Sequence, residues 1–127
     1  MLSDFPLATA LPVSDLARAR SFYEGTLGFT PVEVNEEMGE AGYRSGGVDF
    51  FVYVSQLAGT NQATAAAWRV DDVKATMAEL KSAGVSFEEY DLPGLKTVDG
   101  LLDVPPDGQV AWFKDPDGNI LAVEHFG

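Results

Sequence analysis

The residue types that most often carry catalysis are scarce in this sequence. It has a single histidine, His125, beside Glu124 near the C-terminus, and it has no cysteine. A histidine acts as a general base or a metal ligand only when other polar groups converge on it, and a lone histidine at a chain end lacks that pattern. The absence of cysteine excludes disulfides, thiolate metal sites and a cysteine nucleophile. Residue type alone therefore predicts no catalytic residue.

Carboxylates and aromatic side chains are the more abundant candidates, and together they suit ligand binding. The acids cluster at Glu33, Glu36, Glu37, Glu40 and Asp49, and again at Glu88, Glu89 and Asp91. The aromatic residues in expected strands are Tyr43, Phe50, Trp68, Tyr90 and Trp112. Acidic runs are usually solvated and strand aromatics are usually core residues. An apolar pocket edged by carboxylates would nevertheless attract an aromatic cation, through cation–π contact and electrostatic steering.

Charge and missing motifs exclude several functions. The 127 residues include 20 acids and 8 bases, so the formal net charge is −12. Such a surface repels phosphate backbones and anionic lipids, and we expect neither nucleic acid nor a membrane as partner. No P-loop, GxGxxG, GxSxG or HExxH string occurs, and neither a signal-like start nor a long apolar segment is present. We expect a cytoplasmic protein whose partner is a small molecule.

The elements that must position these residues begin with a strand and a helix. Residues 7–13 form an apolar run typical of a buried strand. From residue 16 to residue 27 apolar side chains recur at helical spacing, and Gly28 indicates where that helix ends. Three short β-like segments follow, at 29–35, 41–45 and 48–55.

The same order of elements recurs after a linker-like segment at 57–62. Val13-Ser14-Asp15-Leu16 returns as Val70-Asp71-Asp72-Val73, 57 residues further along the chain, and each copy can cap a following helix. The second copy is preceded by a strand-like segment at 63–70 and followed by a helix to Gly84, then by strand-like segments at 85–90, 110–114 and 119–125, with an irregular stretch at 91–108. The pattern predicts an α+β domain, 1–127, made of two βαβββ modules, about 1–56 and 63–127, joined by the linker 57–62.

These motifs, in this order, resemble the vicinal oxygen chelate superfamily, which includes glyoxalase I, ring-cleaving dioxygenases, fosfomycin-modifying enzymes and bleomycin-sequestering proteins. The resemblance rests on the two valine motifs, on Phe22-Tyr23 and Leu27-Gly28-Phe29, and on Lys114-Asp115-Pro116-Asp117-Gly118-Asn119. It covers almost the whole chain. It implies a glyoxalase-like fold, in which two βαβββ repeats pair into a curved mixed sheet with the helices outside, and it implies a homodimer.

The metal positions of that superfamily are apolar in this chain. In metal-dependent members the ligands lie five residues before each motif valine and four residues after the glycine of the terminal turn. Here those positions hold Ala8, Ala65 and Ala122, and the remaining ligand position falls on or near Val52. Methyl groups cannot donate to a divalent cation. We therefore predict neither a metal nor another cofactor.

Strand alternation extends the alanine positions into a predicted ligand-binding face. Around Ala122 it adds Glu124, and around Ala65 it adds Arg69, whose guanidinium could fix an anionic group. Trp68 is out of phase with Ala65, so it is expected to face a helix. The predicted ligand-binding residues are Trp112, Tyr43, Phe50, Val52, Arg69, Glu124, Ala8, Ala65 and Ala122.

The sequence thus favours a metal-independent small-molecule binding protein of the glyoxalase/bleomycin-resistance type, with a cationic or aromatic ligand. Two enzymatic alternatives stay open. One is a metal-free lyase or isomerase that uses Glu124 or Tyr43 as acid or base, and the other is a metal-dependent glyoxalase-type enzyme with a relocated site. A regulatory protein with a vestigial pocket is a further alternative.

Overall fold

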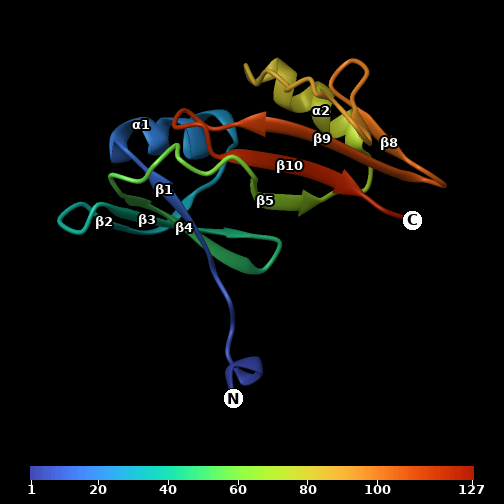
Figure 1. Ribbon diagram of the computed structural model, residues 1–127. Coiled ribbons are helices and arrows are strands. Elements are labelled where there is room, and N and C mark those ends of the chain that lie inside the picture. Colours follow the sequence, from blue (N-terminus) through green and yellow to red (C-terminus); the bar gives the residue numbers. More distant parts are fainter. The chain divides into compact units, whose positions relative to one another are not determined.

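The computed structural model describes residues 1–127 and divides into two compact units, Met1–Thr60 and Asn61–Gly127 (Figure 1). The division falls within the segment 57–62, which has linker character in the sequence. Each unit contains a strand, then a helix, then the strands that complete a four-stranded sheet. The α+β class and the duplicated βαβββ order are therefore confirmed. None of the helices is long and apolar enough to cross a bilayer.

The first unit forms one mixed sheet with a helix on one face. Its elements are a short 3-10 turn (Leu2–Asp4), β1 (Thr9–Val13), α1 (Leu16–Arg20), a π-helical turn (Ser21–Thr26), β2 (Pro31–Asn35), β3 (Glu40–Ser45) and β4 (Val48–Val54). The strand order is β1-β4-β3-β2, with β1 parallel to β4 and the other pairs antiparallel. The Asp15 carboxylate accepts a hydrogen bond from the backbone N–H of Arg18 and so caps α1.

Aromatic rings fill the layer between this sheet and α1. Tyr23 from the π-helical turn stacks on Tyr43 with ring centroids 6.0 Å apart, and it also lies 6.0 Å from Phe50. Phe29 closes the cluster with an edge-on contact to Phe50 at 5.2 Å. The helix-facing side chains of the sheet are buried, namely Leu11, Val13, Ala41, Tyr43, Phe50 and Val52. Strand β1 begins at Thr9 rather than at residue 7, and Leu7 is exposed.

The second unit repeats the plan and adds a small hairpin. Its elements are β5 (Thr64–Arg69), α2 (Val73–Ser82), β6 (Asp91–Leu92), β7 (Leu95–Lys96), β8 (Leu102–Val104), β9 (Gly108–Lys114) and β10 (Ile120–His125). The sheet order is β5-β10-β9-β8, with β5 parallel to β10, while β6 and β7 pair only with each other. Asp72 caps α2 through the N–H of Ala75. The stretch predicted as irregular, 91–108, thus contains the hairpin and β8.

The core of the second unit lies between its sheet and α2. Phe113 stacks on Trp68 at 6.2 Å and meets Phe87 edge-on at 5.8 Å. Leu121 and Val123 share this face with Phe113, and α2 buries Val73 and Met77. Trp68 therefore faces the helix, as its phase in the strand predicts.

Candidate ligand-binding site

The side of each sheet that points away from its own helix, here named the far face, carries the candidate residues of the second unit. Strand pairing aligns Ala67, Ala122 and Trp112 in one row across β5, β10 and β9. The next row aligns Arg69 with Glu124. Four residues predicted as ligand-binding, Arg69, Trp112, Ala122 and Glu124, therefore share one face, and Ala65 joins them by alternation with Ala67.

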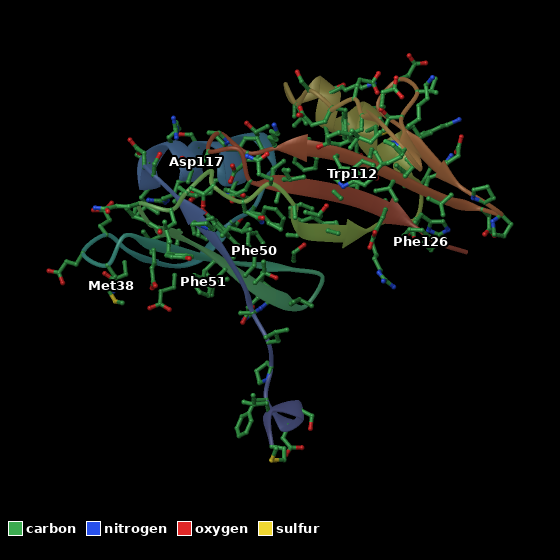
Figure 2. All side chains as sticks on the ribbon, viewed as in Figure 1. Met38, Phe50, Phe51, Trp112, Asp117 and Phe126 are labelled. Atoms are coloured by element: carbon green, nitrogen blue, oxygen red, sulfur yellow. The ribbon has the colours of Figure 1, made fainter.

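Trp112 is held in one orientation by contacts on several sides. Its indole Nε1–H donates to Thr64 Oγ1 at 3.1 Å, and its backbone carbonyl accepts from the N–H of Glu88 at 2.8 Å. Tyr90 packs edge-on against the ring, with centroids 5.5 Å apart and planes at 83°. Burial, and then the charge of Glu88, raises the pKa of the Tyr90 hydroxyl, which stays neutral. The half-buried indole forms a preorganised aromatic wall on the far face (Figure 2).

Two oppositely charged side chains, Arg69 and Glu124, lie on the same face as the Trp112 ring. Arg69 Nε lies 3.5 Å from Glu124 Oε1, with the arginine side chain 85% exposed and the glutamate side chain 20% exposed. The carboxylate is thus the more enclosed charge, and the guanidinium extends into solvent. Ala67 is exposed, Ala65 is half-buried and Ala122 is covered. The accessible floor therefore consists of the β5 alanines rather than of Ala122.

His125 points to the opposite side of β10, in phase with Val123. Its Nδ1 lies 2.8 Å from the carbonyl oxygen of Val70, so this nitrogen carries the proton and donates. The contact ties the end of β10 to the residue that follows β5. The histidine therefore has a structural partner on the helix-facing side.

In the first unit, three residues predicted to bind the ligand lie in the core instead. Tyr43, Phe50 and Val52 point toward α1, where they are 1%, 8% and 0% exposed. Phe50 and Phe51 lie on opposite sides of β4, as Figure 2 shows, so Phe51 occupies the far-face position that the sequence alignment assigned to Val52. The error is one residue of phase, which moves a strand side chain to the other face.

Tyr43 is also unsuited to acid–base chemistry. Its hydroxyl donates to Glu24 Oε2 at 2.9 Å, and Arg20 Nε donates to the same oxygen at 2.7 Å. Burial, and then the hydrogen bond to Glu24, raises the pKa of Tyr43 well above its usual range. The phenol is locked in a hydrogen bond beneath the aromatic layer and anchors the π-helical turn to β3.

The far face of the first unit contains residues that the sequence reasoning missed. In register across the sheet, Ala10 pairs with Phe51, Phe51 with Gly42, and Gly42 with Glu33. Ala8 precedes β1 and is exposed. Strand alternation places Ala8 and Ala10 on one face, and the parallel pairing of β1 with β4 joins Ala10 to Phe51. These two steps together would have identified Phe51 as a far-face residue.

The chain's donors do not fit the metal of the superfamily it resembles. The corresponding positions offer the methyl groups of Ala8, Ala65 and Ala122 and, in β4, the isopropyl group of Val52, none of which donates to a cation. No three carboxylate or imidazole side chains come together elsewhere as a group that could hold a metal ion.

Comparisons with known proteins agree with this fold. The model of the Glyoxalase/Bleomycin resistance protein/Dioxygenase superfamily matches residues 7–123. A glyoxalase family protein from Enterococcus faecalis has a similar structure, with a TM-score of 0.73 and 20% identity over 98% of this chain and 99% of that chain. Lactoylglutathione lyase from Agrobacterium tumefaciens is also similar in structure, with a TM-score of 0.72 and 16% identity over 95% of this chain and 92% of that chain.

A third similar structure is TnmS3, an antibiotic binding protein from Streptomyces sp. CB03234, with a TM-score of 0.67 and 24% identity over 97% of this chain and 96% of that chain. At these identities the likenesses concern the fold alone. No curated protein matches the sequence. The family match spans nearly the whole chain, and the chain belongs to the glyoxalase/bleomycin resistance protein/dioxygenase superfamily.

Proposed function

We propose that this protein binds a small organic molecule without a metal, and that the far face of the second unit supplies the binding surface. The observation that carries the proposal is the fixed indole of Trp112 beside the β5 alanines and the partly enclosed carboxylate of Glu124. A flat ring stacks against such an indole, and a cationic group on that ring pairs with the carboxylate. The preferred ligand is therefore aromatic and cationic.

The missing donor set supports binding over metal-assisted catalysis. A Lewis-acid site needs at least three protein ligands, and the positions expected to supply them from the resemblance are alanine or valine here. TnmS3, whose structure is similar, is described as an antibiotic binding protein, so this fold supports binding as a function in its own right. A metal-free reaction has less support, because Tyr43, one of its two candidate acid–base residues, is buried and its hydroxyl is held in a hydrogen bond to Glu24.

We also propose that the working form is a homodimer. Four large apolar side chains in the first seven residues, Met1, Leu2, Phe5 and Leu7, are between 68% and 94% exposed. Figure 1 shows this segment leading away from the sheet of its own unit. Exposed apolar side chains gathered in one segment are typical of an interaction surface.

The experiment uses the two tryptophans as separate reporters. Proflavine, a flat aromatic cation, is titrated into Trp68→Phe, which keeps Trp112, and into Trp112→Phe, which keeps Trp68. Saturable quenching is expected in the first variant, and an affinity at least about tenfold weaker is expected in the second, since the stacking partner is then smaller. Calorimetry supplies the affinity independently of fluorescence.

Elemental analysis of the purified protein accompanies the titration. Less than about 0.1 transition-metal ion per chain is expected, and chelator treatment should leave the affinity unchanged, because the donors for a tight site are absent. A stoichiometric metal that is needed for binding would contradict the metal-free proposal. Equal affinities of the two tryptophan variants would remove Trp112 from the site.

A further inference from the structure

A groove on the helix side of the second unit lies between α2 and the turn that precedes β8. Its volume is about 430 Å³, which is within the range of small-molecule pockets. Four of its lining residues belong to α2, and the other four belong to the segment 98–103. Because α2 packs on the face of the sheet that is opposite Trp112, the groove is separate from the surface of the proposed function (Figure 1).

The α2 wall of the groove combines two positive charges with an apolar strip. Lys74, Met77, Ala78 and Lys81 recur at helical spacing and therefore share one face of α2. With a rise of about 1.5 Å per residue, the two lysines are about 10 Å apart along the helix axis. Met77 is only 5% exposed and forms the floor between them. The Lys81 ammonium lies 5.9 Å from the ring centroid of Phe87, and neither lysine forms an ion pair.

The opposite wall is a tight turn that carries two negative charges. Val98 and Leu101 exchange backbone hydrogen bonds of 2.8 and 3.1 Å. The two residues between them, Asp99 and Gly100, have φ angles of 53° and 79°, as a two-residue hairpin turn requires. Asp99 and Asp103 line the groove from this side, and neither carboxylate forms an ion pair.

The turn is held against α2 by contacts behind the groove. Glu89 Oε1 accepts hydrogen bonds from the N–H of Gly100 at 2.6 Å and from Thr97 Oγ1 at 2.7 Å. A Cβ built on Gly100 would lie 3.0 Å from Phe87 Cβ and 3.3 Å from Met77 Cε, so the backbone of the turn fits closely over the floor. The two walls are therefore positioned before any ligand arrives, which reduces the entropy that binding would cost.

A groove with one basic wall and one acidic wall suits a ligand that carries both charges. A simple anion would be attracted by the lysines and repelled by the aspartates, and a simple cation would meet the reverse. We propose that this groove binds a small zwitterion, with its carboxylate on the two lysines, its ammonium on the two aspartates and its apolar segment over Met77. The proposal does not rest on the proposed function, because the residues lie on the other side of the sheet.

The test compares ε-aminocaproate, which carries both charges, with caproate and hexylammonium, which carry one each on a chain of the same length. Binding to the isotope-labelled protein is followed by amide chemical shifts at low ionic strength. Saturable shifts are expected in α2 and in residues 98–103. The dissociation constant of ε-aminocaproate is expected to be at least about tenfold lower than that of either singly charged probe.

Each wall is then neutralised separately. Lys74→Gln/Lys81→Gln and Asp99→Asn/Asp103→Asn should each raise the dissociation constant of ε-aminocaproate at least about tenfold. The second variant should keep the turn, because Asn tolerates the positive φ at position 99 and can accept, at position 103, the hydrogen bond that Gln109 Nε2 donates at 3.2 Å.

The matched controls remove the same charges outside the groove. Lys96→Gln/Lys114→Gln and Asp91→Asn/Asp107→Asn should each change the dissociation constant less than about twofold. Losses as large as those of the groove variants would show a general effect of charge and would overturn the proposal. Equal affinity for caproate, or no saturable binding by the unaltered protein, would also overturn it.

Trp112→Phe separates this site from the proposed function. The variant should bind ε-aminocaproate like the unaltered protein, because the indole lies on the opposite side of the sheet. If Trp112→Phe weakens this binding and the groove variants do not, the inference fails while the proposed function keeps its support. If the groove variants alone weaken it, the groove stands whatever the outcome of the proflavine titration.

Discussion

At the residue scale, the best-defined polar group in the first unit is the trio of Arg20, Glu24 and Tyr43. Glu24 accepts from the guanidinium at 2.7 Å and from the phenol at 2.9 Å. The hydrogen bond from Arg20, which is the largest cause, holds the pKa of Glu24 below its usual value, and Tyr43 adds to this effect against an opposing contribution from burial. The trio is a structural link between the helical segment and β3, and its strength depends on the charge of Glu24.

This link predicts an acid-dependent loss of stability. Because the folded-state pKa of Glu24 is depressed, its contribution is present above the ordinary pKa of 4.5 and is lost as pH falls below that value. Glu24→Gln should lower the free energy of unfolding by about 1 kcal/mol at pH 7, and the difference from the unaltered protein should shrink toward pH 3.5. Urea unfolding at both pH values measures it. Asp49→Asn, in a pair that is more than half exposed, should change stability by less than about 0.5 kcal/mol.

At the element scale, the repeated valine motif works as a helix start in both units. Asp15 and Asp72 each accept a hydrogen bond at 3.0 Å from the backbone N–H three residues later, and each precedes a helix that packs on its own sheet. The two caps have the same geometry although α2 is ten residues long and α1 is five residues long before its π-helical turn. The repeat in the sequence is therefore a repeat of local structure.

Because the two helix caps have the same geometry, removing either one should lower the free energy of unfolding by the same amount. Asp15→Ala and Asp72→Ala should each lower the free energy of unfolding by about 1 kcal/mol, because each leaves one helix N–H without its acceptor. Replacing either aspartate by Asn or Ser should restore most of the loss. Chemical denaturation of the alanine, asparagine and serine variants at both positions checks this. If Ala costs nothing at one of the two positions, that aspartate is not a functional cap.

At the scale of the whole molecule, acidity is the dominant property. A formal net charge of −12 on 127 residues draws small cations toward the surface and keeps anions away, which matches the ligand class proposed for the far face of the second unit. Exposed apolar side chains in the first seven residues are the second property at this scale. The charge favours separate molecules, so association of two copies requires apolar contact to outweigh it.

A homodimer should have about twice the chain mass of 13.6 kDa in light scattering coupled to gel filtration. Replacing Leu2, Phe5 and Leu7 by serine should shift the species toward the monomer, because this removes exposed apolar surface. The matched control is Leu92→Ser/Val98→Ser, which removes exposed apolar side chains elsewhere and should leave the mass unchanged. A monomeric mass for the unaltered protein would refute the dimer.

The face of the sheet to which a strand residue points could be predicted from the sequence only where polar residues mark one of the two faces. In β10, Ala122 and Glu124 alternate with Leu121 and Val123, and the polar Glu124 and Arg69 mark one face; strand pairing places Ala67 beside Ala122 and Arg69 beside Glu124, in the phase expected from the sequence. The run Phe50-Phe51-Val52-Tyr53 in β4 is apolar on both faces and has no such marker. There two core residues, Phe50 and Val52, were assigned to the ligand, as was Tyr43 of β3.

The sequence by itself determined the strand and helix that begin each unit, the two helix starts and the apolar residues at the expected metal positions, because these follow from local periodicity, capping chemistry and residue type. The strand expected at 85–90 forms only an isolated bridge between Phe87 and Phe113. Only the tertiary structure decided that Phe51 and Gly42, and not Val52 and Tyr43, lie on the far face. That choice is made by the parallel pairing of β1 with β4, which joins Ala10 to Phe51 across about forty residues of chain. Such a long-range register cannot be inferred from the sequence of a strand whose two faces are equally apolar.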